Sequence, residues 1–404
     1  MEMSHREHPA LDRRGFLKGA SAVVGASALG ALVPARLARA QAGKLRVGLM
    51  LPYTGTFAQL GVIVTNGFKL AVEESGAKLH GREIEYFVVD DGSNPTKAPE
   101  NANRLIQRDK VDFLIGTVHS GVAMGIAKMV RETGVLWINP NAGADEITGP
   151  LCAPNIFRSS FSNWQSTYPL GKVLKDEGHK TAVFITWSYT AGEQMMAGFK
   201  EGFEQQGGTL VRQLHLPFPE VEFQALLTTI ASIKPDAVVA FFGGGAAVKF
   251  LKDYAAAGLK GKIPLYGPGF LTDGALEAVG DAAEGMETTL HYGDGLEIKK
   301  DKSFRLAYAK TYKSQADVFA VQGYDAGQLM VAGIDAVRGD VSNKVGMIKA
   351  MEVAKIDSPR GIWTLSRAHN PVQDIYLRRV VGKENKVIGV AHKALADPAR
   401  GCRA

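Results

Sequence analysis

The pair His119-Ser120 invites a chemical interpretation, because a histidine near a serine can activate the hydroxyl as a nucleophile. Two features argue against that use. Neighbouring residues of an extended segment point in opposite directions, and the G-x-S-x-G turn of serine hydrolases would need glycine where Val118 stands. Ser120 lies where a strand is expected to end and a helix to begin. Its hydroxyl and the following N–H groups would therefore face an anion at the positive helix end. An exported enzyme, supported by Ser120 alone, stays the weaker hypothesis, and we expect no catalytic residue.

Two further motifs could bind a phosphate or a metal. Gly243-Gly244-Gly245 follows a strand and opens a helix, but the Lys and Ser/Thr of a P-loop are missing. A tight turn, or a close backbone approach at a ligand cleft, explains these glycines better. Asp90-Asp91 closes a strand with no third acid nearby, so we favour a turn and cap role over a metal site. We expect no metal and no cofactor.

Alternating strands and helices must position these residues. The first series predicts strands at 45–51, 83–89, 111–115 and 135–138, and helices at 59–74, 95–109 and 121–132. The second predicts strands at 182–186, 209–216, 237–242 and 263–266, and helices at 167–175, 192–206, 222–233 and 246–257. The end of the chain predicts helices at 317–337 and 345–353 and a hairpin of strands 374–380 and 386–391. This alternation predicts an α/β protein with two doubly wound parallel sheets, divided near residue 160.

The charge of the chain is concentrated at its start. The 404 residues carry a formal net charge of +6, and 46% of them are hydrophobic, which excludes a disordered chain. The first 40 residues hold six basic residues and three acids, and they run from Arg13-Arg14 through an Ala/Gly-rich segment to Ala38-Arg39-Ala40. This layout is similar to a twin-arginine export signal cleaved near Ala40, the alternative being an N-terminal membrane anchor. The mature chain would be a periplasmic protein of charge +3, too weakly basic to bind nucleic acid.

The only two cysteines are Cys152 and Cys402, and their spacing fits no metal site. An exported protein meets an oxidising compartment, so a disulfide between them is the favoured interpretation and two free thiols the alternative. Such a disulfide would tie down the end of the chain.

Short motifs spread over nearly the whole mature chain resemble the type I periplasmic solute-binding proteins of ABC transporters, of the leucine/isoleucine/valine-binding kind. One motif alone would be weak, but the ordered set is specific. The matching stretches are 47–49, 52–55, Gly61, 90–91 with Pro95, 115–116 with Ser120, 137–140, 155–158, Gly192, 236–238, 267–268, 284–286 and 324–326.

The resemblance implies two Rossmann-like lobes joined by three crossover strands at a hinge. Lobe 1 would comprise residues 43–160 and 292–365, lobe 2 residues 161–291 and 366–391, and residues 392–404 a tail. A ligand would bind between the lobes, at the carboxyl ends of strands, and the lobes would close on it. The implied function is ligand capture and delivery to an ABC permease by a protein that is usually a monomer.

The resemblance also implies which residues contact the ligand. In amino-acid-binding members a serine at the position of Ser120, with backbone at Ala142 and Gly143, holds the carboxylate. The groups that hold the ammonium are missing: Gly143 replaces a threonine, Gly245 a tyrosine, and Gly269 or Phe270 an acid. A buried ammonium without an acid would be costly. The other candidate contacts are Tyr53, Leu60, His119, Tyr189, Gly244, Phe319 and Gln322.

The expected ligand is therefore a carboxylate without an α-amine. Because Tyr189 is similar to a residue of members that bind aromatic acids, we expect a benzoate, hydroxybenzoate or phenylpropanoid. Two rivals stay open: a branched-chain amino-acid binder with rearranged amine recognition, and a sensor or receptor module that signals instead of feeding a transporter.

Overall fold

The computed structural model describes residues 43–76 and 78–403, and the export signal predicted at 1–40 lies outside them. No helix in the described part of the chain is long and apolar enough to cross a membrane. Residues from Gly43 onward form one compact unit, which contains two sheets.

The first sheet has six strands in the order β2-β3-β1-β4-β5-β6, and all but β2 run parallel. Side chains of β1 alternate between two hydrophobic cores, with Val47 and Leu49 on one face and Met50 on the other, so helices must cover both faces. The strands are β1 Leu45–Leu51, β2 Lys78–Leu79, β3 Arg82–Asp90, β4 Phe113–Ile115, β5 Leu136–Asn139 and β6 Ile156–Arg158.

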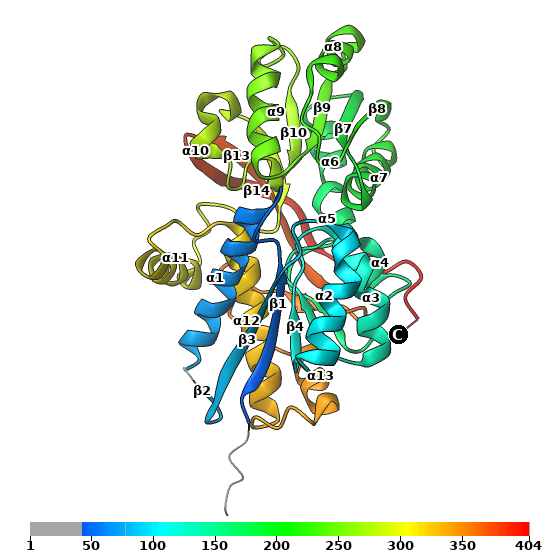
Figure 1. The fold of residues 1–404 in the computed structure, drawn as a ribbon. Helices are drawn as coiled ribbons and strands as arrows, with labels where there is room; N and C mark the ends of the chain where they lie inside the picture. Colours follow the sequence, from blue (N-terminus) through cyan, green and yellow to red (C-terminus); the bar gives the residue numbers. More distant parts are fainter. Residues whose placement is uncertain (1–42, 77, 404) are drawn as a thin grey trace, which may run out of the picture. The chain divides into compact units, whose positions relative to one another are not determined.

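Helices α2, α3 and α4 pack on one face of this sheet, and α1, α12 and α13 on the other. Figure 1 shows α1 and α12 side by side. They approach closely because a Cβ on Gly67 would lie 2.0 Å from the carbonyl oxygen of Ala320, so only glycine fits there. The helices are α1 Ala58–Glu74, α2 Ala98–Asn103, α3 Ser120–Thr133, α4 Asp145–Thr148, α11 Lys299–Tyr312, α12 Val318–Ala336 and α13 Lys344–Glu352.

The second sheet has the order β12-β13-β11-β10-β9-β7-β8, with β14 paired to β13. Its parallel strands are β7 Thr181–Ser188, β8 Thr209–Pro217, β9 Ala237–Phe241, β10 Leu265–Pro268 and β11 Glu287–Leu290. The antiparallel strands are β12 Thr364–Leu365, β13 Pro371–Val381 and β14 Glu384–Leu395. Its helices are α5 Asn163–Thr167, α6 Leu170–Asp176, α7 Thr190–Gln205, α8 Gln224–Ile233, α9 Gly245–Ala256 and α10 Leu276–Val279.

The predicted α/β class with two doubly wound sheets is confirmed. We call the first sheet with α1 to α4 and α11 to α13 the first lobe, and the second sheet with α5 to α10 the second lobe. The chain passes between them three times, after β6, after β11 and after α13. The lobe boundaries given above stay a prediction at the level of single residues.

Several elements differ from those expected. The helix expected at 167–175 is divided into α5 and α6 by Pro169, which lacks the N–H that a continuous helix needs. The helix expected at 95–109 is a 3₁₀ turn Pro95–Lys97, then α2, then a π-helical turn Arg104–Arg108. Helix α11 was not expected, because it is mostly polar and buries little beyond Phe304 and Tyr308.

The predicted disulfide is present. Cys152 and Cys402 are bonded, with their Cα atoms 5.6 Å apart. Because β14 belongs to the second lobe and Cys152 follows α4 of the first, residues 396–402 form an additional connection between the lobes.

Candidate ligand-binding site

A cavity of about 400 Å³, counting its open mouth, lies where strands of both sheets end. This size is at the lower end of the range for small-molecule sites. The first lobe supplies segments that follow β4 and β5 and the amino ends of α1 and α12, and the second lobe supplies segments that follow β7, β9 and β10. Phe161 and Asn163 come from the crossover after β6 and the start of α5. The lining residues are Phe57, Leu60, Val118, Ser120, Asn141, Gly143, Phe161, Asn163, Tyr189, Ala191, Met195, Phe241, Gly243, Phe270 and Phe319.

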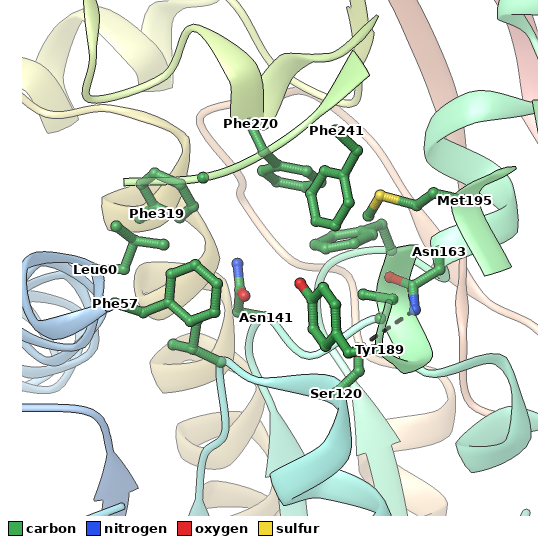
Figure 2. Close-up of a pocket in the computed structure, with 15 residues that line it drawn as sticks. Phe57, Leu60, Ser120, Asn141, Asn163, Tyr189, Met195, Phe241, Phe270 and Phe319 are labelled. Carbon is green, nitrogen blue, oxygen red and sulfur yellow. Dashed lines mark hydrogen bonds between the residues drawn. The ribbon is translucent and has the colours of Figure 1, made fainter. Parts of the chain in front are cut away.

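None of these fifteen side chains is charged, and six carry aromatic rings. The ring centroids of Phe161 and Phe270 are 4.7 Å apart, and those of Phe270 and Phe319 are 6.2 Å apart. Tyr189 stacks on Phe241 at 6.2 Å with an interplanar angle of 18°. Rings at these spacings contact one another and form a fixed apolar wall suited to an aromatic ligand (Figure 2).

Ser120 is the first residue of α3, and its Oγ accepts a hydrogen bond from Asn163 Nδ2 at 3.3 Å. The helix end behind it is occupied: the Nδ1 atom of His119 accepts hydrogen bonds from the N–H groups of Gly121 at 3.0 Å and Val122 at 3.4 Å. The expectation that these N–H groups face an anion is therefore wrong. Helix α3 therefore contributes the side chain of Ser120 to the cavity, and the N–H groups of Gly121 and Val122 are not available to a ligand.

His119 lies behind the cavity wall and does not line it. Its ring is 4.8 Å from those of Tyr189 and Phe218, and burial lowers its pKa to about 4. The imidazole is therefore neutral near pH 7, and because Nδ1 accepts, Nε2 carries the hydrogen. His119 caps a helix and supports Tyr189, and it does not activate Ser120.

The turn after β5 is only partly available to a ligand. The N–H of Ala142 donates to the carbonyl of Thr117 at 3.0 Å, so the expected contact through Ala142 is wrong. Gly143 does line the cavity, and no group in the described part of the chain accepts from its N–H. A Cβ on Gly143 would lie 2.3 Å from Asn163 Oδ1 and 2.6 Å from Phe161 Cε2, so a side chain at this position would displace both residues.

Gln322 lies one layer behind the cavity. It is fully buried, and its Oε1 accepts a hydrogen bond from Asn141 Nδ2 at 2.6 Å. Its Nε2 lies 3.4 Å from Nε2 of His291, a second buried side chain. Gln322 therefore fixes the orientation of Asn141, which is one of the two side-chain amides that line the cavity.

Tyr189 supplies a polar side-chain atom to the second lobe's wall, from the segment that follows β7. Figure 2 shows its hydroxyl pointing into the cavity, toward Asn141. Burial raises the pKa of Tyr189, so the hydroxyl stays protonated and can donate a hydrogen bond.

Three other predicted contacts, Tyr53, Gly244 and Gly245, do not line the cavity. The hydroxyl of Tyr53 is 2.8 Å from Thr65 Oγ1 on α1, and burial raises its pKa to about 12. Gly244 has φ +59° and opens α9, with Thr56 O 3.0 Å from its Cβ position, as a close backbone approach predicts. Gly245 does not line the cavity either, and Gly243 does.

Two other motifs have structural roles. Asp90 Oδ1 accepts hydrogen bonds from the N–H groups of Tyr53 at 2.8 Å and Gly92 at 2.9 Å, so the turn role predicted for Asp90-Asp91 is confirmed. No cluster that could hold a metal occurs among the described residues. A Cβ on Gly269 would lie 1.9 Å from Nη2 of Arg378, so an acid at that position would meet a buried arginine.

Six of the predicted contacts thus line the cavity together: Leu60, Ser120, Gly143, Tyr189, Phe270 and Phe319. The residues missed include Phe161 and Asn163, which follow β6, and Phe57, which precedes α1. Asn141 and Val118 were missed although they lie within two residues of predicted contacts.

Comparison with known proteins agrees with this architecture. The model of the periplasmic binding protein family matches residues 44–385. A solute-binding protein of an ABC transporter from R. palustris, solved in complex with benzoate, is 51% identical and has a TM-score of 0.87, and the match covers 90% of this chain and 100% of that one.

Two further relatives are more distant. An ABC transporter solute-binding protein from Rhodopseudomonas palustris BisB5, solved with 3,4-dihydroxybenzoic acid, is 31% identical, with a TM-score of 0.83 and coverage of 88% of this chain and 99% of that one. The Leu/Ile/Val-binding protein homolog 6 of Brucella melitensis is 29% identical over 350 residues, which are 84% of this chain and 88% of that one. The chain therefore belongs to the periplasmic binding protein family, as the ordered motifs between residues 47 and 326 predicted.

Proposed function

We propose that this protein is the extracytoplasmic solute-binding component of an ABC importer and that it binds a small aromatic carboxylate of the benzoate type. The observation that carries the proposal is the lining of the cavity, which combines six aromatic rings, one of them the phenol of Tyr189, and three further neutral polar side chains with no charged residue.

The absence of an acid separates this cavity from an amino-acid site. A bound amino acid would bury its ammonium without a counter-charge, which costs several kcal/mol. A carboxylate needs only donors, and hydrogen bonds to a charged acceptor are about twice as strong as neutral ones. The Ser120 hydroxyl, the Tyr189 hydroxyl and the Gly143 N–H could supply them.

The aromatic rings support an aromatic ligand for a similar reason. A benzoate ring between Phe161, Phe270 and Tyr189 would replace water with ring contacts, each worth about 0.5–1.5 kcal/mol beyond the buried area. Two relatives were solved with ligands of this class, benzoate and 3,4-dihydroxybenzoic acid. The ligand of this chain would be held between the lobes, which would then close and dock on a membrane permease.

The second candidate is a branched-chain amino-acid binder, favoured by the name of the Brucella relative. Titration calorimetry with benzoate, 4-hydroxybenzoate and leucine separates the two. We expect micromolar or tighter binding of benzoate and no heat from leucine. Tight leucine binding without a response to either aromatic acid would contradict the proposal.

Residues 1–40 are proposed to export the protein to the periplasm as a twin-arginine signal. The support is the sequence Arg13-Arg14 before an Ala/Gly-rich segment that ends at Ala40. Amino-terminal sequencing of the exported protein should begin at Gln41. Replacing both arginines by lysine should retain the precursor in the cytoplasm, and normal export of that variant would exclude the twin-arginine route.

A further inference from the structure

One side chain of the second lobe reaches the first lobe beside the cavity. Gln194 lies on α7, and its Oε1 accepts a hydrogen bond from the N–H of Asp145 at 2.9 Å. Its Nε2 donates to Oε2 of Glu146 at 2.5 Å. Because Asp145 and Glu146 open α4, Gln194 joins the two lobes by two hydrogen bonds, one of them to a charged acceptor.

Gln194 also contacts the cavity wall. Its Oε1 accepts a second hydrogen bond, from Asn163 Nδ2 at 2.8 Å. The same Nδ2 donates to Ser120 Oγ at 3.3 Å, so both hydrogens of the Asn163 amide are used. The Asn163 Oδ1 atom is buried without a partner among the described residues, so the two bonds of Nδ2 alone fix the orientation of the amide. Gln194 does not itself line the cavity.

We propose that Gln194 is a positioning residue that holds the two lobes together around the bound ligand and orients Asn163 toward Ser120. The inference rests on the proposed function, since it requires lobes that close on a ligand. A bond that exists only when the lobes are together shifts the population toward the closed form and slows ligand release. A glutamine suits this place because the Asp145 N–H needs an acceptor and the Glu146 carboxylate needs a donor.

The test exchanges the hydrogen-bond donor and acceptor of the Gln194–Glu146 pair. Gln194→Glu removes the donor and places a carboxylate against Glu146, so we expect the dissociation rate of benzoate to rise about tenfold with little change in the association rate. Gln194→Glu combined with Glu146→Gln restores one donor and one acceptor in exchanged positions. The double variant should return to within about threefold of the wild-type dissociation rate.

The matched control is Glu193→Gln. Glu193 is the neighbour of Gln194 on α7, but its side chain lies 3.2 Å from His215 of the second lobe, so this variant should bind as the wild type does. Stopped-flow fluorescence measures both rates, and thermal unfolding checks that each variant folds. In small-angle scattering, Gln194→Glu should reach the compact form only at a higher benzoate concentration than the wild type needs.

The outcomes separate the two proposals. An unchanged dissociation rate in folded Gln194→Glu, or a double variant no better than the single one, would overturn the role of Gln194. Binding of leucine alone would contradict the proposed function, and the same variants would then test Gln194 with leucine as the probe.

Discussion

The Nδ1 atom of His119 lies 3.0 Å from the backbone nitrogen of Gly121 and accepts its hydrogen bond, so a histidine side chain caps α3. A cap of this kind works only while the imidazole is neutral, because a protonated ring has no acceptor. Burial lowers the pKa of His119 to about 4, against about 6.5 for an exposed histidine. The cap is therefore a source of pH dependence in folding.

Replacing His119 by asparagine should remove this pH dependence. Between pH 6.5 and 4 the unfolded chain binds a proton at this residue and the folded chain does not, so acidification destabilises the wild type. An asparagine at this position would still cap the helix but would not titrate. We expect the free energy of unfolding of the wild type to fall relative to His119→Asn by up to about 3 kcal/mol over this range.

Urea unfolding at several pH values measures this difference. Burial raises the pKa of Asp145 and of Asp317 to about 7, and these carboxyls titrate in the same range, with the opposite sign. They are present in both proteins, so their contribution cancels in the comparison. Two stability curves that stay parallel from pH 7 to pH 4 would contradict the neutral cap.

Ser120→Ala should weaken benzoate binding. The hydroxyl lines the cavity beside Asn163, and loss of a donor to a carboxylate costs roughly 1–3 kcal/mol, which is about 5- to 150-fold in affinity. Titration calorimetry compares the benzoate affinity of Ser120→Ala with that of a control, Ser188→Ala. Ser188 is exposed and lies next to Tyr189 in the sequence. Equal affinity of Ser120→Ala and the wild type would remove Ser120 from the site.

Tyr189→Phe tests the hydroxyl that the segment after β7 brings to the cavity. The substitution keeps the ring that stacks on Phe241 and removes only the hydroxyl, so we expect affinity for benzoate to fall about tenfold or more. Since burial raises the pKa of Tyr189, wild-type binding should not change between pH 7 and pH 9 through this residue. Tyr168→Phe, which removes a hydroxyl bonded to Gln205 instead, is the control. If the two variants bind alike, the Tyr189 hydroxyl does not contact the ligand.

Sequence patterns predicted the architecture because buried parallel strands leave continuous apolar runs. The run Leu45–Leu51, which forms β1, is an example. Because the strand ends at Leu51, the loop that follows it lies at the cleft between the lobes. Helix α11 left no such signal, since it buries only a few side chains such as Phe304. Proline lacks the N–H that a helix interior needs, so Pro169 indicates a helix boundary. The helix expected at 167–175 nevertheless included it.

The lining of the cavity was harder to predict, because tertiary packing decides which loop residues face the cavity and the local sequence does not. Ala142 and Gly143 are neighbours, yet the N–H of one donates to Thr117 and that of the other has no described acceptor. The histidine cap has no specific sequence pattern, since His is not among the favoured capping residues. Asn163 was missed because its contacts with Ser120 and Gln194 join residues far apart in the chain.

The disulfide offers a test of how the lobes are tied together. Strand β14 ends at Leu395 in the second lobe, and Cys402 is bonded to Cys152 in the first. The bond closes a loop across 250 residues of sequence separation, and removing such a link typically costs about 2–5 kcal/mol of folding free energy. The double variant Cys152→Ser, Cys402→Ser should therefore unfold at a temperature several degrees below the wild type.

Reductant supplies the matched comparison for this variant. Reduced wild type should unfold close to the double variant, and reductant should leave the double variant unchanged. The ion pair of Arg400 with Glu201, at 2.7 Å, still holds part of the tail when the disulfide is absent. The unfolding temperature should therefore fall less in the double variant than in a triple variant that also carries Arg400→Ala. Because Glu201 lies on α7 of the second lobe, the ion pair alone does not join the tail to the first lobe. If neither the double variant nor reduction lowers the unfolding temperature, the Cys152–Cys402 link does not stabilise the fold.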